Sequence, residues 1–136
     1  MNDTAFLLGR MLGLSDLLHA QYCRVVRGGN LPPQLLGNQH YSMATDRPAR
    51  AVAVLGDRLR IYRAWADTAR VEKQTRPDLQ IAVKTAKRVL RQMSEVAPEM
   101  RDLPQRGFND QGRAEMLLGY LSGDGKQNSE GEEESE

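Results

Sequence analysis

The histidines, the cysteine and the acidic residues are the side chains that could carry out catalysis, but their spacing assembles no catalytic site. His19 and His40 are the two histidines of the sequence, and no HxxxH or HExxH pattern includes them. Helical periodicity puts His19 at the edge of an apolar stripe, which favours a structural role. It puts Cys23 on the polar side of the same segment, without an acid–imidazole pair close in sequence. The sequence has no GxxxxGKS/T phosphate loop either. We therefore expect a protein that binds a partner and catalyses no reaction, with no catalytic residue, no cofactor and no metal site.

Basic residues are the second group with a chemical use. Between residues 47 and 91 there are twelve basic and four acidic residues, a net charge of +8. Arginine and lysine on a helix neutralise phosphates without requiring a particular base sequence. The candidate nucleic-acid-binding residues are Arg60, Arg63, Arg70, Lys84, Lys87, Arg88 and Arg91, with Arg24 and Arg27 beside the first loop as second choice. The alternative is that these cations merely keep helix surfaces in water.

Few aromatic side chains accompany these cations. Tyr62 and Trp65 are expected to point into the core, and Tyr41 is the aromatic residue freer to stack on a base. The pattern therefore favours contact with a phosphate backbone over recognition of bases.

Four segments with helical periodicity carry these residues, expected at 3–27, 47–72, 78–97 and 110–121. Each has one apolar stripe, so the four must pack together. The connection 28–46 is long, and its sequence allows one short helical turn at 34–36. We predict an all-α fold, a small helical bundle of about four helices, as one domain over residues 1–121.

Three expectations concern packing. Gly9 and Gly13 lie four apart in the first helix, where they either admit another backbone or are simply tolerated. Arg58 projects near the apolar side of the second helix, so its guanidinium either meets an anionic partner or extends to water. The last helix should face inward through Ala114, Leu117, Leu118 and Leu121.

Residues 122–136 are predicted to be a disordered acidic tail, because they offer no apolar surface to bury. Residues 121–136 hold six acids and one base, whereas residues 1–120 hold eighteen bases and twelve acids. A basic body with an acidic tail suggests a polyanionic partner.

Composition limits the remaining classes. Aromatic residues make up 5% of the chain and apolar residues 40%, which favours an aliphatic helical core over a β-sandwich. The longest apolar run, 51–55, is far below the roughly 20 residues of a membrane-spanning helix, so we expect no membrane partner. The N-terminal segment has no secretory pattern and the single cysteine forms no internal disulfide, so we expect a cytoplasmic protein.

Three segments resemble a known family. FLLGRMLGLSDLLHAQY near the start, DRPARAVAVLGDRLRIYRAWA in the middle and RAEMLLGYLSG near the end are similar to the C-terminal region of the large subunit of type I-C CRISPR Cascade complexes and related subtypes. Residues 7–10, 47–66 and 114–121 carry the likeness, in the family's order and spacing.

The resemblance implies a specific role. In that family this region is also made separately, by internal translation, as the Cascade small subunit, and Met1 stands where such a start would fall. It implies a prokaryotic, cytoplasmic helical bundle in several copies, placed in the inner belly against the backbone and large subunits of the guide RNA complex. There it would help hold the displaced non-target DNA strand and stabilise the R-loop during antiviral defence, while a recruited protein supplies the nuclease.

Reversing Lys84, Lys87, Arg88 and Arg91 to Glu is predicted to weaken R-loop formation and to leave guide-RNA loading intact. The main alternative is a helical protein–protein adaptor that does not touch nucleic acid. A transcription regulator is disfavoured because the long helices and loops lack a short recognition helix after a tight turn.

Overall fold

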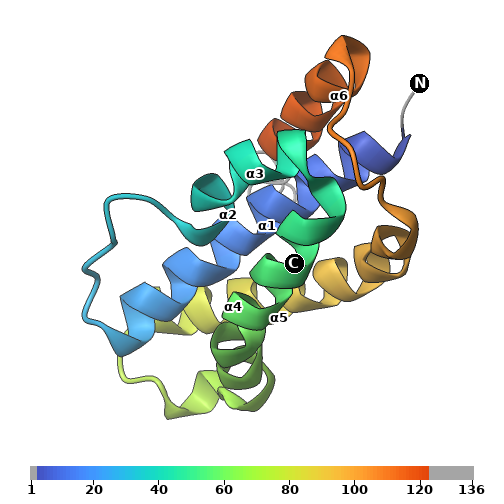
Figure 1. Cartoon of the computed structure of the whole chain (residues 1–136). Helices are drawn as coiled ribbons and strands as arrows, with labels where there is room; N and C mark the ends of the chain where they lie inside the picture. The colour runs from blue at the N-terminus through green and yellow to red at the C-terminus, as the bar shows by residue number, and fades with distance from the viewer. Residues whose placement is uncertain (1–2, 123–136) are drawn as a thin grey trace.

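The computed structural model describes residues 3–122, so the predicted tail from residue 123 onward lies outside the described residues. All regular structure in this range is helical (Figure 1). The helices are α1 (Asp3–Val26), α2 (Leu36–Gln39), α3 (Tyr41–Asp46), α4 (Pro48–Thr68), α5 (Pro77–Val96) and α6 (Asp110–Leu121), with 3₁₀ turns η1 (Val71–Lys73) and η2 (Ala97–Asp102). The prediction of an all-α bundle built on four main helices is confirmed.

Two helix ends follow local chemistry. Gly28 and Gly29 adopt positive φ angles of 66° and 90°, and the Gly29 N–H donates to the Cys23 carbonyl at 3.1 Å, which closes α1. The second helix was predicted to run to residue 72, but α4 ends at Thr68, whose hydroxyl donates back to the carbonyl of Ala64 at 3.2 Å. Ala69 is extended, so Arg70 does not lie on α4 as predicted.

Helix α1 passes through the middle of the molecule (Figure 1). It was predicted to bury one narrow stripe, but every residue from 11 to 21 is buried because α6, α5, α2 and α4 surround it. Buried polar side chains on it are hydrogen-bonded: the Ser15 hydroxyl donates to the Met11 carbonyl at 2.8 Å, and Asp16 accepts from the Tyr120 hydroxyl.

The connection 28–46 is more ordered than a loop, because it contains α2 and α3. The Leu36 N–H donates to Nδ1 of His19 at 3.0 Å, and the Asn38 N–H donates to the Asp16 carboxylate at 3.0 Å. Two buried polar side chains of α1 thereby hold α2 on its surface.

Helices α1 and α6 cross with their backbones in close contact. A Cβ atom at Gly9 would overlap the carbonyl oxygen of Met116, and one at Gly119 would overlap that of Phe6. For Gly9, close approach of another backbone is therefore the correct explanation.

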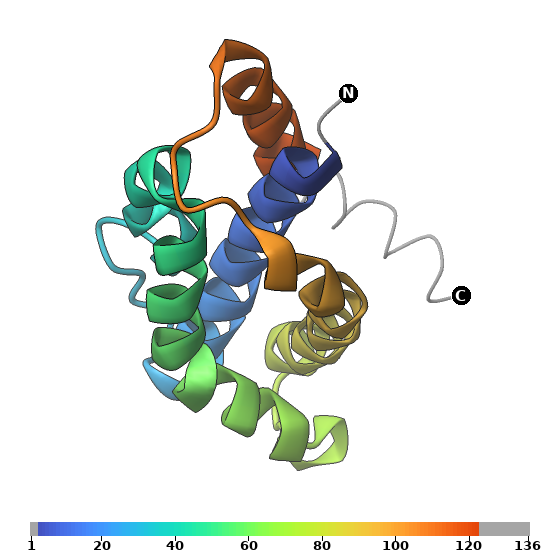
Figure 2. The ribbon, with the colours of Figure 1, turned by 45° about the vertical axis from the view of Figure 1, so that its right-hand side comes forward.

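The predicted inward face of α6 is wrong. Gly112, Met116 and Gly119 are its buried residues. Gly119 and Met116 lie where the backbones of α6 and α1 touch, whereas Gly112 is covered by the Phe108 side chain. Leu117, Leu118 and Leu121 are 47%, 57% and 56% exposed, and Ala114 is exposed as well. Figure 2 shows α6 packed beside α1.

No helix within residues 3–122 combines the length and the apolar character needed to cross a membrane.

Candidate nucleic-acid interface

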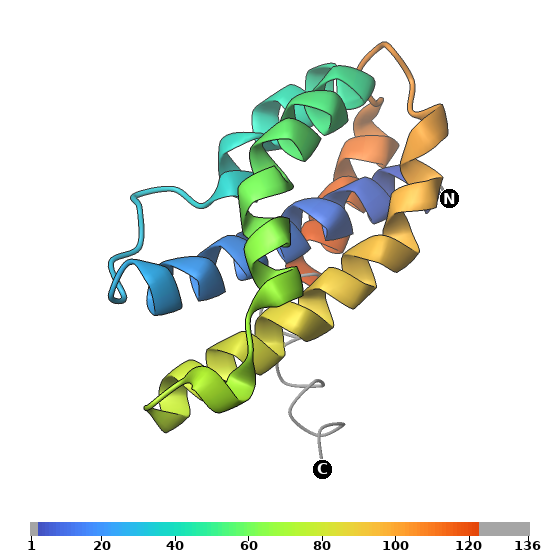
Figure 3. The ribbon, with the colours of Figure 1, turned by 90° about the horizontal axis from the view of Figure 1, so that it is seen from below.

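Helices α4 and α5 carry most of the predicted site, and they meet at the C-terminal end of α4 (Figure 3). There Nζ of Lys87 donates to the carbonyl oxygen of Ala66 at 3.1 Å. The carbonyls in the last turn of a helix have no donor within the helix, and Lys87 supplies one to Ala66. Its positive charge also complements the negative end of the α4 dipole.

A groove runs between the two helices. One hollow lies among Arg60, Arg63, Ala64, Asp67, Leu90 and Ser94, and a second lies among Asp67, Thr68, Ala69, Arg70, Val71, Glu72 and Lys87. Asp67 borders both, so the two hollows adjoin, and we call them together the α4–α5 groove. Arg60 and Arg63 line the first hollow, and Arg70 and Lys87 line the second.

Ion pairing leaves the cations of this groove accessible. Arg60 pairs with Asp57 at 3.6 Å, and Arg70 with Glu72 at 3.5 Å, and all four side chains are mostly exposed. Exposed pairs of this kind contribute about 0–1 kcal/mol, so a phosphate can displace them. Arg63 is exposed and forms no ion pair within residues 3–122.

Lys84 and Arg91 form an outer ridge on α5 next to the groove. They lie seven residues apart, and therefore on the same side of the helix, and both are exposed. Neither forms an ion pair with another described residue. Arg60 and Arg63 on α4 are exposed as well.

Lys87 and Arg88 are less exposed than Lys84 and Arg91, the other two cations of the predicted α5 face. Both are half-buried, and Lys87 caps α4 through Ala66. Nε and Nη2 of Arg88 are buried and have no hydrogen-bond partner within residues 3–122. The face is therefore not uniformly open to solvent.

Arg24 and Arg27 lie elsewhere. Arg24 is in the last turn of α1, where its Nη1 donates to Oε1 of Gln21 at 3.0 Å, and Arg27 follows the helix. Arg24 borders a hollow shared with Gly28, Gly29, Arg76, Asp78, Leu79 and Ile81, which is separate from the α4–α5 groove.

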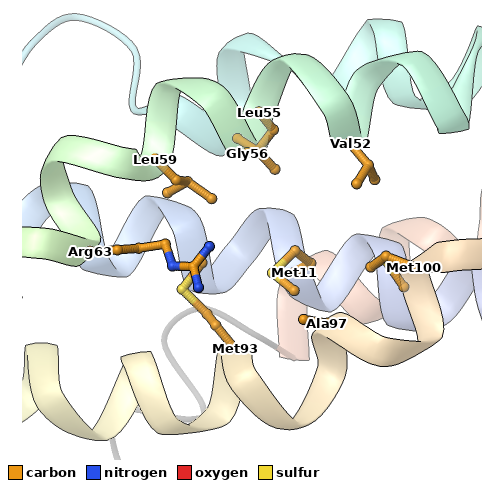
Figure 4. A pocket seen from close by; sticks show the side chains of 9 residues that line it. All are labelled: Met11, Val52, Leu55, Gly56, Leu59, Arg63, Met93, Ala97 and Met100. Carbon is orange, nitrogen blue, oxygen red and sulfur yellow. The ribbon is translucent and has the colours of Figure 1, made fainter. Parts of the chain in front are cut away.

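An apolar cavity of about 130 Å³ also lies between α4 and α5, with α1 beneath it (Figure 4). Its lining residues are Met11, Val52, Leu55, Gly56, Leu59, Arg63, Met93, Ala97 and Met100. Sequence periodicity assigns these apolar residues to the core and so misses the cavity. Arg63 lies one helical turn after Leu59, and this spacing could have indicated that an arginine borders the apolar surface.

The aromatic residues offer little for base stacking. Tyr62 and Trp65 pack inward against Tyr22, with ring centroids 4.9 and 5.5 Å apart, as predicted. Tyr41 is not the freer residue expected, because it packs edge-on against Tyr120 at 5.2 Å and burial raises the pKa of its hydroxyl. Arg58 is exposed, so its side chain extends to water.

The titratable residues of α1 are structural. Cys23 was predicted on the polar side of the helix but is fully buried, and burial raises the pKa of its thiol, which keeps it protonated. His19 is buried and accepts the bond from Leu36, in keeping with its predicted structural role. Among residues 3–122, no three His, Cys, Asp or Glu side chains gather as metal ligands.

No family model, no curated protein and no solved structure matches this chain. The cations on α4 and α5 and the three resembling segments are therefore the features that bear on its function.

Proposed function

We propose that this chain is the non-catalytic small subunit of a type I-C-like CRISPR RNA-guided Cascade complex. In this role it lines the inner belly of the ribonucleoprotein, in contact with the backbone and large subunits and with further copies of itself. Its basic helical surface holds the displaced non-target DNA strand and stabilises the R-loop while the guide RNA pairs with the target strand. The cytoplasm of a prokaryotic cell is where such a complex acts.

The accessible cations of α4 and α5 carry this proposal. Arg60, Arg63, Lys84 and Arg91 are exposed. Among the described residues only Arg60 of these four forms an ion pair, with Asp57, and this exposed pair is weak. Exposed guanidinium and ammonium groups without nearby stacking rings suit a phosphate backbone more than base edges. The all-α architecture is the one that the family resemblance implies.

The test is reversal of these four residues to Glu in the assembled complex. Each change removes one phosphate contact and adds a repelling carboxylate, so we expect R-loop formation to fall by about tenfold or more. Lys87 and Arg88 stay unchanged, because Lys87 caps α4 and Arg88 is half-buried, and Glu at either position would disturb the fold.

A matched control reverses Arg47, Arg50, Arg58 and Arg106, which are also exposed and outside the groove. It should form R-loops like the parent, and both variants should load guide RNA normally. Equal R-loop formation by the two reversed complexes would assign the α4–α5 surface to protein contacts or to solvent.

A helical adaptor without a nucleic-acid role is the second candidate. The observation that favours it is the apolar ridge of Leu117, Leu118 and Leu121, which leaves three large side chains half-exposed on one face of α6. An adaptor would bury this ridge against another protein and leave the cations in water.

A further inference from the structure

Two arginines have buried guanidinium nitrogens without an acceptor among the described residues. They are Arg88 on α5, through Nε and Nη2, and Arg10 on α1, through Nε. A buried donor left unpaired destabilises the fold, and more so when it is charged. The acceptors that a guanidinium fork matches are the oxygens of carboxylate and phosphate.

Further unpaired charge surrounds Arg88. We call Lys84, Arg88 and Arg91 the α5 flank; they lie within one side of α5, and none of them forms an ion pair within residues 3–122. The ion pairs of the described chain join Asp57, Glu72, Asp78 and Asp46 to Arg60, Arg70, Arg76 and Arg113, which lie outside the flank.

The end of α6 lies close to Arg10. Gly119, in the last turn of α6, lies so near α1 that a Cβ atom there would come within 2.9 Å of the Arg10 backbone nitrogen. Helix α6 ends two residues later, at Leu121. Helices α5 and α6 both pack on α1, so the end of α6 and the α5 flank lie on the same central helix.

The composition of residues 123–136 complements the flank. The segment has six acidic residues and one lysine, a net charge of −5, and no apolar residue. It therefore has nothing to fill the cavity in Figure 4 or to cover the leucine ridge of α6. Carboxylates in a row present the same charge to arginines as a phosphate chain does.

We propose that residues 123–136 bind the α5 flank and Arg10 of the same chain, as a carboxylate mimic of the nucleic-acid backbone. The segment occupies Lys84 and Arg91 whenever a polyanion does not, so it weakens the binding of incidental nucleic acid to the unassembled chain. The contact within the chain is argued from the charges and positions of the residues named above. The competition between the segment and nucleic acid for these cations rests on the proposed function.

Chain length makes this contact feasible. The segment has fourteen residues. A coil of that length would span roughly 20 Å root-mean-square, and a domain of this size has a radius of gyration of about 14 Å. A short flexible link gives an effective concentration near 1 mM. If the same contact between separate molecules had a dissociation constant of about 0.1 mM, the bound state within one chain would be about ten times as populated as the unbound state.

Paramagnetic NMR tests the contact directly. A nitroxide at residue 129 (S129C, with the buried Cys23 changed to Ala) in the full chain should broaden the amide signals of 84–91 and of Arg10. This broadening should be present at about 50 mM salt and lost at about 500 mM, since screening weakens the contact. Broadening that is absent at low salt, or equal over α3 and α5, overturns the proposal.

Matched variants locate the contact. The neutral segment D124N/E130Q/E132Q/E133Q/E134Q/E136Q should show no broadening at low salt. K84Q/R88Q/R91Q should lose it as well. R47Q/R50Q/R58Q should keep it, because it removes three exposed arginines that lie on α4 or directly before it. Loss in both triple variants would mean attraction to net charge and would refute a specific flank.

Affinity for a single-stranded DNA oligonucleotide tests the competition. The neutral-segment chain should bind about tenfold tighter than the parent, and this gain should shrink in the K84Q/R88Q/R91Q background. An unchanged affinity alongside an observed NMR contact would refute competition. Absence of DNA binding by every variant would refute the proposed function and leave the NMR result to decide the contact.

Discussion

His19 and Asp16 show how single buried polar residues of α1 organise the chain around it. Nδ1 of His19 accepts the Leu36 N–H, so this nitrogen must be unprotonated in the folded chain. Burial, and secondarily the charge of Arg27, lowers the pKa of His19. Neutral His19 therefore holds the start of α2, and protonation opposes this contact.

Acidification is expected to destabilise the chain through His19. Since its pKa is lower in the folded than in the unfolded state, the unfolded chain binds the proton first, and stability falls as the pH drops below about 6.5. His19→Asn keeps an acceptor oxygen near the position of Nδ1 but does not titrate. Urea unfolding at about pH 7.5 and 5.5 should show a smaller loss of stability in H19N than in the parent. An equal loss in both proteins would remove His19 as its cause.

At the scale of helices, the crossing of α1 and α6 depends on two glycines. Gly9 and Gly119 each face a backbone carbonyl of the opposite helix, so the helices touch without side chains between them. This closeness turns the leucines of α6 outward and leaves Met116 as its main buried apolar residue.

Alanine at either glycine should separate the two helices. A methyl group at position 9 or 119 overlaps a backbone oxygen that cannot rotate away, so we expect G9A and G119A each to lower the free energy of unfolding by about 2–3 kcal/mol. Gly56 in α4 is the matched control, because a Cβ atom there meets nothing within 4 Å. G56A should stabilise the chain by up to about 1 kcal/mol through helix propensity. Urea unfolding measures all three variants, and equal effects at positions 9 and 56 would contradict the close crossing.

At the scale of the whole molecule, charge separates the two candidate functions. The α4–α5 groove and its outer ridge collect cations whose described acidic partners are few and exposed. A nucleic-acid-binding subunit uses this charge by releasing counterions, whereas an adaptor leaves it in water.

Salt dependence of single-stranded DNA binding should report this difference. We expect one phosphate contact at each of Arg60, Arg63, Lys84 and Arg91. The slope of the logarithm of the binding constant against the logarithm of salt concentration should then be about 3 units shallower in R60Q/R63Q/K84Q/R91Q than in the parent. Fluorescence anisotropy across a salt series measures both slopes. A parent slope near zero, or one that the four substitutions leave unchanged, would favour the adaptor.

The site was predictable as a set of residues but not as a surface. The excess of cations in 47–91 pointed to α4 and α5, and Arg60, Arg63, Lys84 and Arg91 are exposed there. Charge counting could not show that Lys87 bonds to Ala66, nor that Arg88 turns two nitrogens inward. Both depend on which neighbour lies beside α5.

The amino-acid sequence alone determined the helices and several of their ends. Glycines after α1 and the Asn109 side chain, which accepts from the Gly112 N–H at 2.8 Å, act within a few residues, so their effect is readable from local order. Tertiary structure alone decided which side of α6 is buried, that α1 is enclosed all round, and that α4 and α5 enclose a cavity. The physical reason is that a helix buries the face on which other elements pack. At the α1–α6 crossing, the close contact of the two backbones requires glycine on the inner face of α6, so three leucines are left exposed on its outer face.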